Sequence, residues 1–471
     1  MRRLLLAGIL CCLTLTALAK EVTVHGFVTE VSSPTTFVID DYKVTRDNTL
    51  TLELSGSEGF QPSSFRAEEI RVGTELEVKG EYDEQSGELK AKSVKVFLED
   101  TQKLKRRALL EQIPVLTKSG SGWEGEIRAD GGRIRVLPIT LVTVKLNGTE
   151  RNQQKGAASD EPSPLTSLDV LNLDTFVRYE GTRAANGQIE ATKVEFEHGE
   201  LEPGEAKMWK KLQPEVKNPD YASFVPGTFR MPGCVYGFCE QEIVPSKEAQ
   251  DYIARVGESL IPAHQKELSA DDPLKIPFQF FLVKSKSFNA VAYPNGVVLV
   301  HSGVFDILQN EAQLAFVLAH EISHAVEKHA WEASHYHRKE LLALRAGGAF
   351  IPYAGLASGL AADAIKNQYA RSLENQADRV GLQWMLAAGY DIREAPASWK
   401  ALSIKKGDGP INPFWSSHDN KTTRRSYLMA EIKNNYSDVD FSKLKRDSEE
   451  FHRVAQTVQE FETKKKTSKA K

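Results

Sequence analysis

Apolar and polar residues follow two different periods along this chain. In residues 72–80 and 87–97 apolar side chains alternate with polar ones, the period of a strand with one buried face. The same alternation returns at residues 173–181 and 187–196, and a Ser-Gly or Asn-Gly turn separates the strands of each pair. The N-terminal part is therefore predicted to be all-β.

These strands recur at a spacing of about one hundred residues, which indicates two copies of one domain rather than a solenoid. Residues 24–28 and 123–127 are also alike, and we interpret them as the two opening strands. We expect two small OB-like barrels, over residues 20–105 and 119–200, separated by a connector that begins at residue 104. A spacer, a substrate-docking module and a ligand-binding module are all consistent with such barrels.

Farther along, apolar residues recur at the spacing of helices. One helix is marked by Leu314, Val317, Leu318, Ile322 and Ala325, and a second by Tyr369, Leu373, Ala377, Val380 and Trp384. The first carries His-Glu-x-x-His and the second carries Glu-x-x-x-Asp. Residues 205–440 are therefore predicted to form a mainly α (α+β) domain, followed by a charged helix or tail over residues 441–471.

The histidine motif has the spacing of a metal site. His320 and His324 are four residues apart, so a helix points both imidazoles to one side. Glu321 lies about 100° round the helix from His320, where it can reach a metal-bound water without being a ligand. The alternative is two histidines that are merely satisfied in the core, and the second motif makes that alternative less favourable.

The third ligand decides the class of metalloprotease. A metzincin has Gly and His where this chain has Glu327 and Ala330, so that class is excluded. His329 has the wrong spacing, and we expect it to be exposed or weakly packed. Glu374 is the better candidate, and Asp378 on the same face is placed to accept the other ring N–H of a ligand histidine.

With these motifs placed, residues 245–435 resemble the HtpX- and BepA-like zinc metalloproteases, a gluzincin family that includes the CAAX prenyl proteases. Four segments carry the likeness in the family's order: residues 289–304, 311–329 and 371–378, and Ser417-His418 followed by Arg424. Residues 22–200 also resemble bacterial β-barrel repeats of unknown function.

The first resemblance implies one zinc ion per chain, held by His320, His324 and Glu374. It implies that Glu321 activates a water molecule as general base and that Asp378 supports a ligand histidine.

The resemblance also assigns residues outside the metal site. His418 is expected to stabilise the oxyanion and Arg424 to organise the late loop, although Asp419 stands where the family usually has proline. An edge strand is expected to hold an extended peptide, with Asn289, Ala290, Gly296 and Val298 as its residues.

Both ends of the chain bear on its location. Basic residues 1–3, apolar residues 4–18 and the Ala-x-Ala site at residues 17–19 predict a signal peptide that is cleaved after Ala19. We therefore expect a periplasmic or secreted protein without a transmembrane anchor. Peripheral contact with a membrane is left open. Residues 341–364 are apolar, but Arg345 and Pro352 favour a helical hairpin over the active site.

The cysteines agree with an oxidising compartment. Two of the four precede the predicted cleavage site, which leaves Cys234 and Cys239 in the mature chain. A disulfide is the favoured interpretation, with free thiols or a metal site as alternatives.

The formal net charge is −4, and no strongly basic face suggests a nucleic-acid partner. The lysine-rich run at residues 464–471 is the only charge run, and we interpret it as a solvated tail. The sequence predicts an exported zinc metalloendopeptidase, and the family resemblance implies unfolded or misassembled envelope proteins as its substrates. The rival hypothesis is a chaperone-like binding protein with a latent or structural zinc site.

Overall fold

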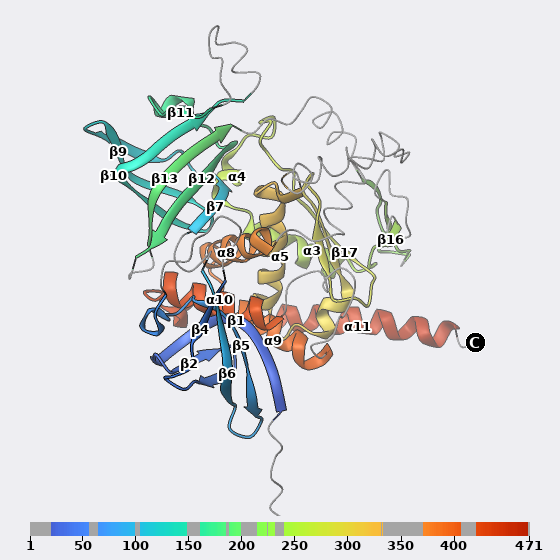
Figure 1. Ribbon diagram of the computed structural model, residues 1–471. Helices are drawn as coiled ribbons and strands as arrows, with labels where there is room; N and C mark the ends of the chain where they lie inside the picture. The colour runs from blue at the N-terminus through green and yellow to red at the C-terminus, as the bar shows by residue number, and fades with distance from the viewer. Residues whose placement is uncertain are drawn as a thin grey trace, which may run out of the picture.

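The computed structural model describes residues 20–55, 65–98, 104–147, 161–184, 188–198, 214–223, 225–230, 240–330, 332, 371–406 and 421–469. They form two β units and a helical unit with small sheets (Figure 1). The multidomain organisation predicted from the two periods is confirmed.

The first β unit is a barrel closed by five strands, with a sixth strand paired beside them. Its elements are β1 (Lys20–Ser33), β2 (Thr36–Ile39), β3 (Tyr42–Thr45), β4 (Leu52–Ser55), the short 3-10 helix η1 (Ala67–Glu69), β5 (Glu75–Asp83) and β6 (Glu88–Phe97). The pairings β1–β2–β3 and β1–β5–β6 are antiparallel, and the parallel pair β3–β6 closes the ring. The sixth strand, β4, pairs with β6 beyond the stretch that pairs with β3. Inward side chains such as Val28, Leu76 and Leu89 are fully buried, as the alternation requires.

The second β unit repeats much of this pairing. It contains β7 (Leu104–Leu109), β8 (Val115–Ser119), β9 (Gly122–Ala129), β10 (Gly132–Lys145), β11 (Ser163–Pro164), η2 (Leu168–Val170), β12 (Thr175–Arg183) and β13 (Ile189–His198). β10 runs parallel to β13 in two stretches, with a register shift between Val136 and Leu141. It thereby takes the place of both β3 and β4, which pair with β6.

Two expectations about this repeat are wrong. Residues 104–109 are not a connector, because β7 pairs with β12 as β1 pairs with β5, so the second unit begins there and not at residue 119. Residues 123–127 belong to β9, which takes the place of β2 rather than of the opening strand β1. Alternation identifies a strand with one buried face, but it does not identify the strand's partner.

The helical unit is built around one central helix. It contains α3 (Lys247–Leu260), α4 (Ala263–Glu267), η3 (Ser302–Asp306), α5 (Glu311–Val326), α8 (Arg371–Ala387), α9 (Glu394–Lys406), α10 (Lys421–Asn435), η4 (Phe441–Lys443) and α11 (Glu449–Lys469). Every residue of α5 is buried. Phe451 and Val454 of α11 belong to the same core, so the segment expected to be a separate tail begins inside the domain.

Two three-stranded sheets accompany the helices. One is β14 (Glu215–Lys217), β15 (Thr228–Arg230) and β16 (Glu240–Glu242), and the other has the order β17 (Gln279–Val283), β19 (Val297–His301), β18 (Ala290–Ala292). Among the described residues, no helix has both the length and the apolar character needed to cross a bilayer.

The first β unit packs mainly on α10 and the second meets α8, while Arg183 of the second unit also donates to Glu431 of α10 (Figure 1). The first lies against α10, where the Phe27 amide donates to Ser426 Oγ at 2.9 Å. The second meets α8 through its β9–β10 turn, where Arg379 Nη2 donates to Asp130 Oδ1 at 2.5 Å and Tyr179 donates to Oδ2 at 2.6 Å. Gly131, in the same turn, is so close to α8 that a Cβ would lie 2.7 Å from the carbonyl of Arg379.

We predict that Gly131→Ala weakens this docking. Gly120 in the β8–β9 turn is the matched control, because both glycines have positive φ, +70° and +61°, but a Cβ on Gly120 would meet nothing within 4 Å. Gly131→Ala should therefore lower the free energy of unfolding by about 1–3 kcal/mol more than Gly120→Ala does, as overpacking typically costs. Urea denaturation measures both variants, and equal losses would contradict the close approach.

Candidate metal centre

Helix α5 carries the histidine motif into the interior of the domain. Its first turn is capped by Asn310, whose side chain accepts a hydrogen bond from the Gln313 amide at 3.0 Å. His320, Glu321 and His324 are 1%, 6% and 3% exposed, so each polar atom needs a partner or a ligand there.

Helix α8 approaches α5 closely at the motif. Gly381, which has no side chain, lies at this crossing, and Ala377 one turn earlier is fully buried. A Cβ on Gly381 would lie 3.3 Å from the His320 amide nitrogen, so there is little room for a larger residue. The close packing brings Glu374 opposite the two histidines.

The three predicted ligands lie together. The His320 and His324 Nε2 atoms are 3.0 Å apart, and Glu374 lies 3.5 Å from the first and 3.6 Å from the second. Ligand atoms on a tetrahedral zinc ion with bonds of about 2.0–2.2 Å are separated by about 3.2–3.6 Å. The Glu374 distances lie in this range and the distance between the histidines is slightly shorter, so these residues are donors of the kind that zinc binds and lie close enough together to share one ion.

Asp378 and Arg424 contact the ligand residues outside the ligand cluster. Asp378 Oδ1 lies 3.1 Å from His320 Nδ1, the contact expected for a carboxylate that orients a ligand histidine. Arg424 donates to Glu374 at 2.8 Å and to both oxygens of Asp378 at 2.6 and 2.7 Å. Its guanidinium lies over the Trp399 ring at 4.4 Å. Arg424 thus joins two carboxylates of α8 directly, a contact that the sequence analysis did not assign to it.

Glu321 is held by the small sheet that contains β18. Its Oε2 accepts a hydrogen bond from the Ala292 amide of β18 at 2.9 Å. Burial raises the pKa of Glu321 to about 7, although nearby His320 and the Ala292 amide lower it. The side chain can therefore both hold and release a proton near neutral pH.

The profile of peptidase family M48 matches residues 247–432, the segment that contains all of these residues. This part of the chain is therefore similar to peptidase family M48. A domain of unknown function, DUF5666, matches residues 25–95 in the first barrel.

Curated relatives resemble the M48 domain. The putative beta-barrel assembly-enhancing protease of Vibrio cholerae is 32% identical over 174 residues, 35% of this chain and 34% of that protein. The Escherichia coli beta-barrel assembly-enhancing protease is 33% identical over 146 residues, 29% and 30% of the two chains. The bovine mitochondrial metalloendopeptidase OMA1 is 33% identical over 181 residues, 35% of each. The chain thus spans about a third of the length of these relatives.

The M48 domain contains buried polar residues that the sequence analysis missed. His329 is fully buried against His324, so the expectation that it is exposed or weakly packed is wrong. Gln376 and Glu327 lie beside it and are 3% and 2% exposed. Nothing in the local sequence distinguished them, because Glu327 stands beside Lys328 and Gln376 beside Asn375, as on an exposed helix face.

The substrate strand is placed differently from the expectation. Val298 lies on β19, which has β17 on one side and β18 on the other, so it cannot serve as an edge. Ala290 lies on β18, which is the outer strand next to Glu321. Asn289 precedes β18 and is buried, and Gly296 lies in the β18–β19 turn with φ +88°.

Some predicted features lie outside the described residues. These are His418, Cys234 and Cys239, the signal peptide over residues 1–19 and the hairpin over residues 341–364.

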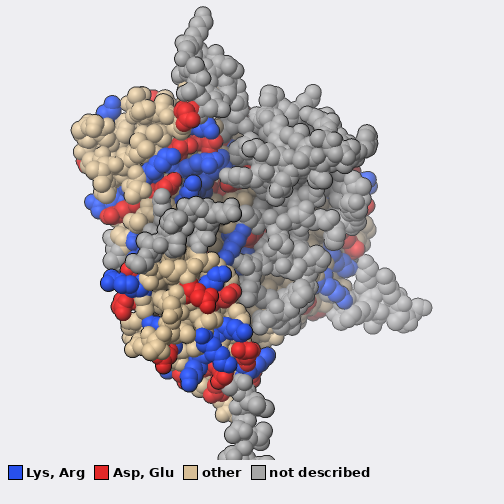
Figure 2. Space-filling view, viewed as in Figure 1, with Lys and Arg blue, Asp and Glu red and all other residues tan. Residues whose placement is uncertain are grey.

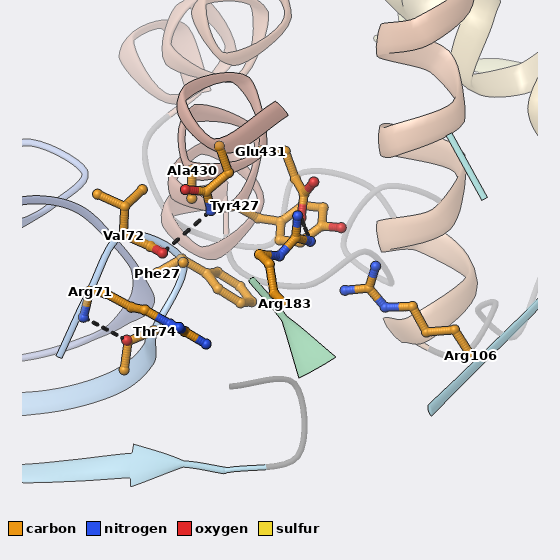
Figure 3. A pocket seen from close by; sticks show the side chains of 11 residues that line it. Phe27, Arg71, Val72, Thr74, Arg106, Arg183, Tyr427, Ala430 and Glu431 are labelled. Carbon is orange, nitrogen blue, oxygen red and sulfur yellow. Dashed lines mark hydrogen bonds and ion pairs between the residues drawn. The ribbon is translucent and has the colours of Figure 1, made fainter. Parts of the chain in front are cut away.

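A cavity lies away from the metal centre, between the two β units and α10 (Figure 3). Phe27, Arg106, Arg183, Tyr427 and Glu431 are among the residues that line it, and its volume of about 30 Å³ has room for very few water molecules. It is a gap in a docking interface, and the reacting groups lie elsewhere.

We predict that Arg424→Met destabilises the metal-free protein. It leaves two buried carboxylates, Glu374 and Asp378, without their shared cation, which should cost about 3–5 kcal/mol. Zinc supplies positive charge at the same place, so it should restore stability more in the variant than in the wild type. Thermal unfolding with and without zinc measures this.

Arg255→Met is the control for Arg424→Met. Arg255 forms a surface ion pair with Glu450 at 2.5 Å and is 56% exposed. Its loss should cost less than about 1 kcal/mol. Equal losses in the two variants would contradict the role given to Arg424.

We also predict that metal binding depends on pH. Burial lowers the pKa of His320, but Asp378 and Glu374 outweigh it and raise the pKa to about 9 in the metal-free site. Below pH 9 His320 must therefore release a proton as the metal binds, and the affinity should fall about tenfold per pH unit from pH 9 to 7. Zinc titrations in competition with a chelator measure the affinity at each pH. Equal affinities at pH 7 and 9 would refute the assignment of His320 as a ligand that releases a proton.

Proposed function

We propose that this chain is a zinc-dependent metalloendopeptidase. The observation that carries the proposal is the buried group of His320, His324 and Glu374, whose ligand atoms lie within 4.8 Å of one another. Glu321 lies beside this group on the same helix. The M48 match and the metalloendopeptidase among the relatives support the same reaction class. A glutamate from a second helix as third ligand also supports the gluzincin class.

Zinc bound to these three residues would lower the pKa of a water molecule and polarise the carbonyl of a peptide bond. Glu321 is suited to take the water's proton, because its pKa is raised to about 7 by burial. The hydrogen bond from the Ala292 amide holds Oε2 in place and leaves Oε1 to handle the proton. Glu321 would then transfer it to the leaving amine.

The substrate peptide is proposed to lie along β18. This strand is short, and its Ala292 amide turns to Glu321 rather than to β19. An extended peptide added at this edge would run past Glu321 and be held by main-chain hydrogen bonds, with alternate side chains pointing to opposite faces.

Protein substrates of the envelope are the proposed targets, with one zinc ion per chain. The signal-like pattern of residues 1–19 and two relatives named for beta-barrel assembly support this setting. Figure 2 shows Lys and Arg interspersed with Asp and Glu over the described residues on the side of the molecule seen in Figure 1. No single charged surface there marks a site that selects substrates. For the barrels, the ring β1–β2–β3–β6–β5 with one parallel pair supports an OB-like fold.

We predict that Glu321→Gln abolishes cleavage without loss of metal. Removal of the base should slow casein hydrolysis by about 10²–10⁴-fold, while all three ligands remain. Casein cleavage and zinc content are measured on the purified wild type, on Glu321→Gln and on Glu258→Gln, which changes an exposed glutamate of α3. If the wild type binds zinc but does not cut, the chaperone-like binding protein becomes the better hypothesis.

A further inference from the structure

We propose that His329 positions the metal ligand His324, and that Gln376 and Glu327 extend this support to strand β7 of the second β unit. This inference rests on the proposed zinc binding. It gives the second β unit a part in holding the metal centre, beyond the spacer or docking role considered from the sequence.

The first step of this support is the contact between two imidazoles. His324 Nε2 faces His320 and Glu374, so in the zinc-bound site the proton of His324 must be on Nδ1. His329 Nδ1 lies 2.8 Å from His324 Nδ1 and is placed to accept this proton's hydrogen bond. The two rings meet edge to face, with centroids 4.8 Å apart.

The second step fixes the tautomer of His329. If Nδ1 accepts, the proton of neutral His329 is on Nε2, which lies 3.1 Å from Gln376 Oε1. Gln376 therefore accepts with its oxygen and donates with its amide nitrogen. Each hydrogen bond sets the direction of the next one, because every group has a different atom for donating and for accepting.

The third step reaches the second β unit. Gln376 Nε2 donates to the Arg107 carbonyl of β7 at 3.1 Å and to Glu327 Oε2 at 3.2 Å. Glu327 Oε2 also accepts from the Leu109 amide of β7 at 2.9 Å. Two main-chain groups of one strand therefore end a hydrogen-bond chain that begins at the metal ligand.

Burial makes this chain of hydrogen bonds costly to break. His329, Glu327 and Gln376 are between 0% and 3% exposed, so water cannot easily replace a lost partner. Asp130 accepts hydrogen bonds from Arg379 of α8 and, at 3.4 Å, from Arg106 of β7, so this turn also connects β7 with α8. Metal binding and the order of β7 should therefore be linked, and each should strengthen the other.

The test compares zinc affinity by competition with a chelator in the full chain. His329→Leu should bind zinc about 10–100-fold more weakly than the wild type, the usual loss when a partner of a ligand histidine is removed. His329→Gln keeps an acceptor and a donor and should recover part of the affinity. Tyr390→Phe removes a buried hydrogen bond to Glu311, remote from the site, and should bind like the wild type.

Amide hydrogen exchange of residues 104–109 tests whether the support reaches β7. If His329 acted only on His324, zinc binding would leave this exchange unchanged. Zinc should slow exchange of the β7 amides in the wild type but much less in Gln376→Met, which breaks the chain at its second step. Gln376→Met also replaces His329→Leu in the affinity test if that variant does not fold.

Equal zinc affinity in His329→Leu and the wild type would overturn the positioning role. Unchanged β7 exchange on zinc binding would overturn the link to the second β unit. A wild type that binds no zinc would overturn the proposed function itself, and this inference with it.

Discussion

The buried ion pairs of Arg424 are the interaction on which the metal centre depends. Glu374 and Asp378 are one helical turn apart on α8, and both are almost completely inaccessible to water. Two carboxylates so close in the interior repel each other and disfavour ionisation. The guanidinium of Arg424 donates to both of them and places a positive charge between them, with Glu374 directed to the ligand cluster and Asp378 to His320.

This requirement makes the position of α10 critical, since α10 carries Arg424. The first barrel holds α10 through residues that flank Arg424: Thr423 donates to the His25 carbonyl, Arg425 pairs with Asp41, and Ser426 accepts from the Phe27 amide. The second β unit holds α8 through Asp130 and Arg379. The two β units therefore fix the positions of α8, which carries Glu374, and of α10, which carries Arg424.

Buried polar groups need hydrogen-bond partners, and this requirement also explains the position of Glu321. Glu321 is oriented by a main-chain amide of β18, which keeps one oxygen fixed while burial raises its pKa toward neutrality. The amide is available because β18 is an outer strand, and the same property makes the strand suitable for an extended peptide. Base and proposed substrate site thus share one element.

Local spacing in the sequence determined the strands, the two site helices and the relation of His320, Glu321 and His324, because these depend only on the helical or strand period. It also pointed to Glu374 and Asp378, which share a face of one helix. Tertiary structure decided the rest: β7 as a member of the second unit, β18 as the edge, Arg424 between two carboxylates, and buried His329 beside His324. These depend on contacts between distant parts of the chain, such as Leu109 with Glu327, 218 residues apart, for which a local pattern carries no signal.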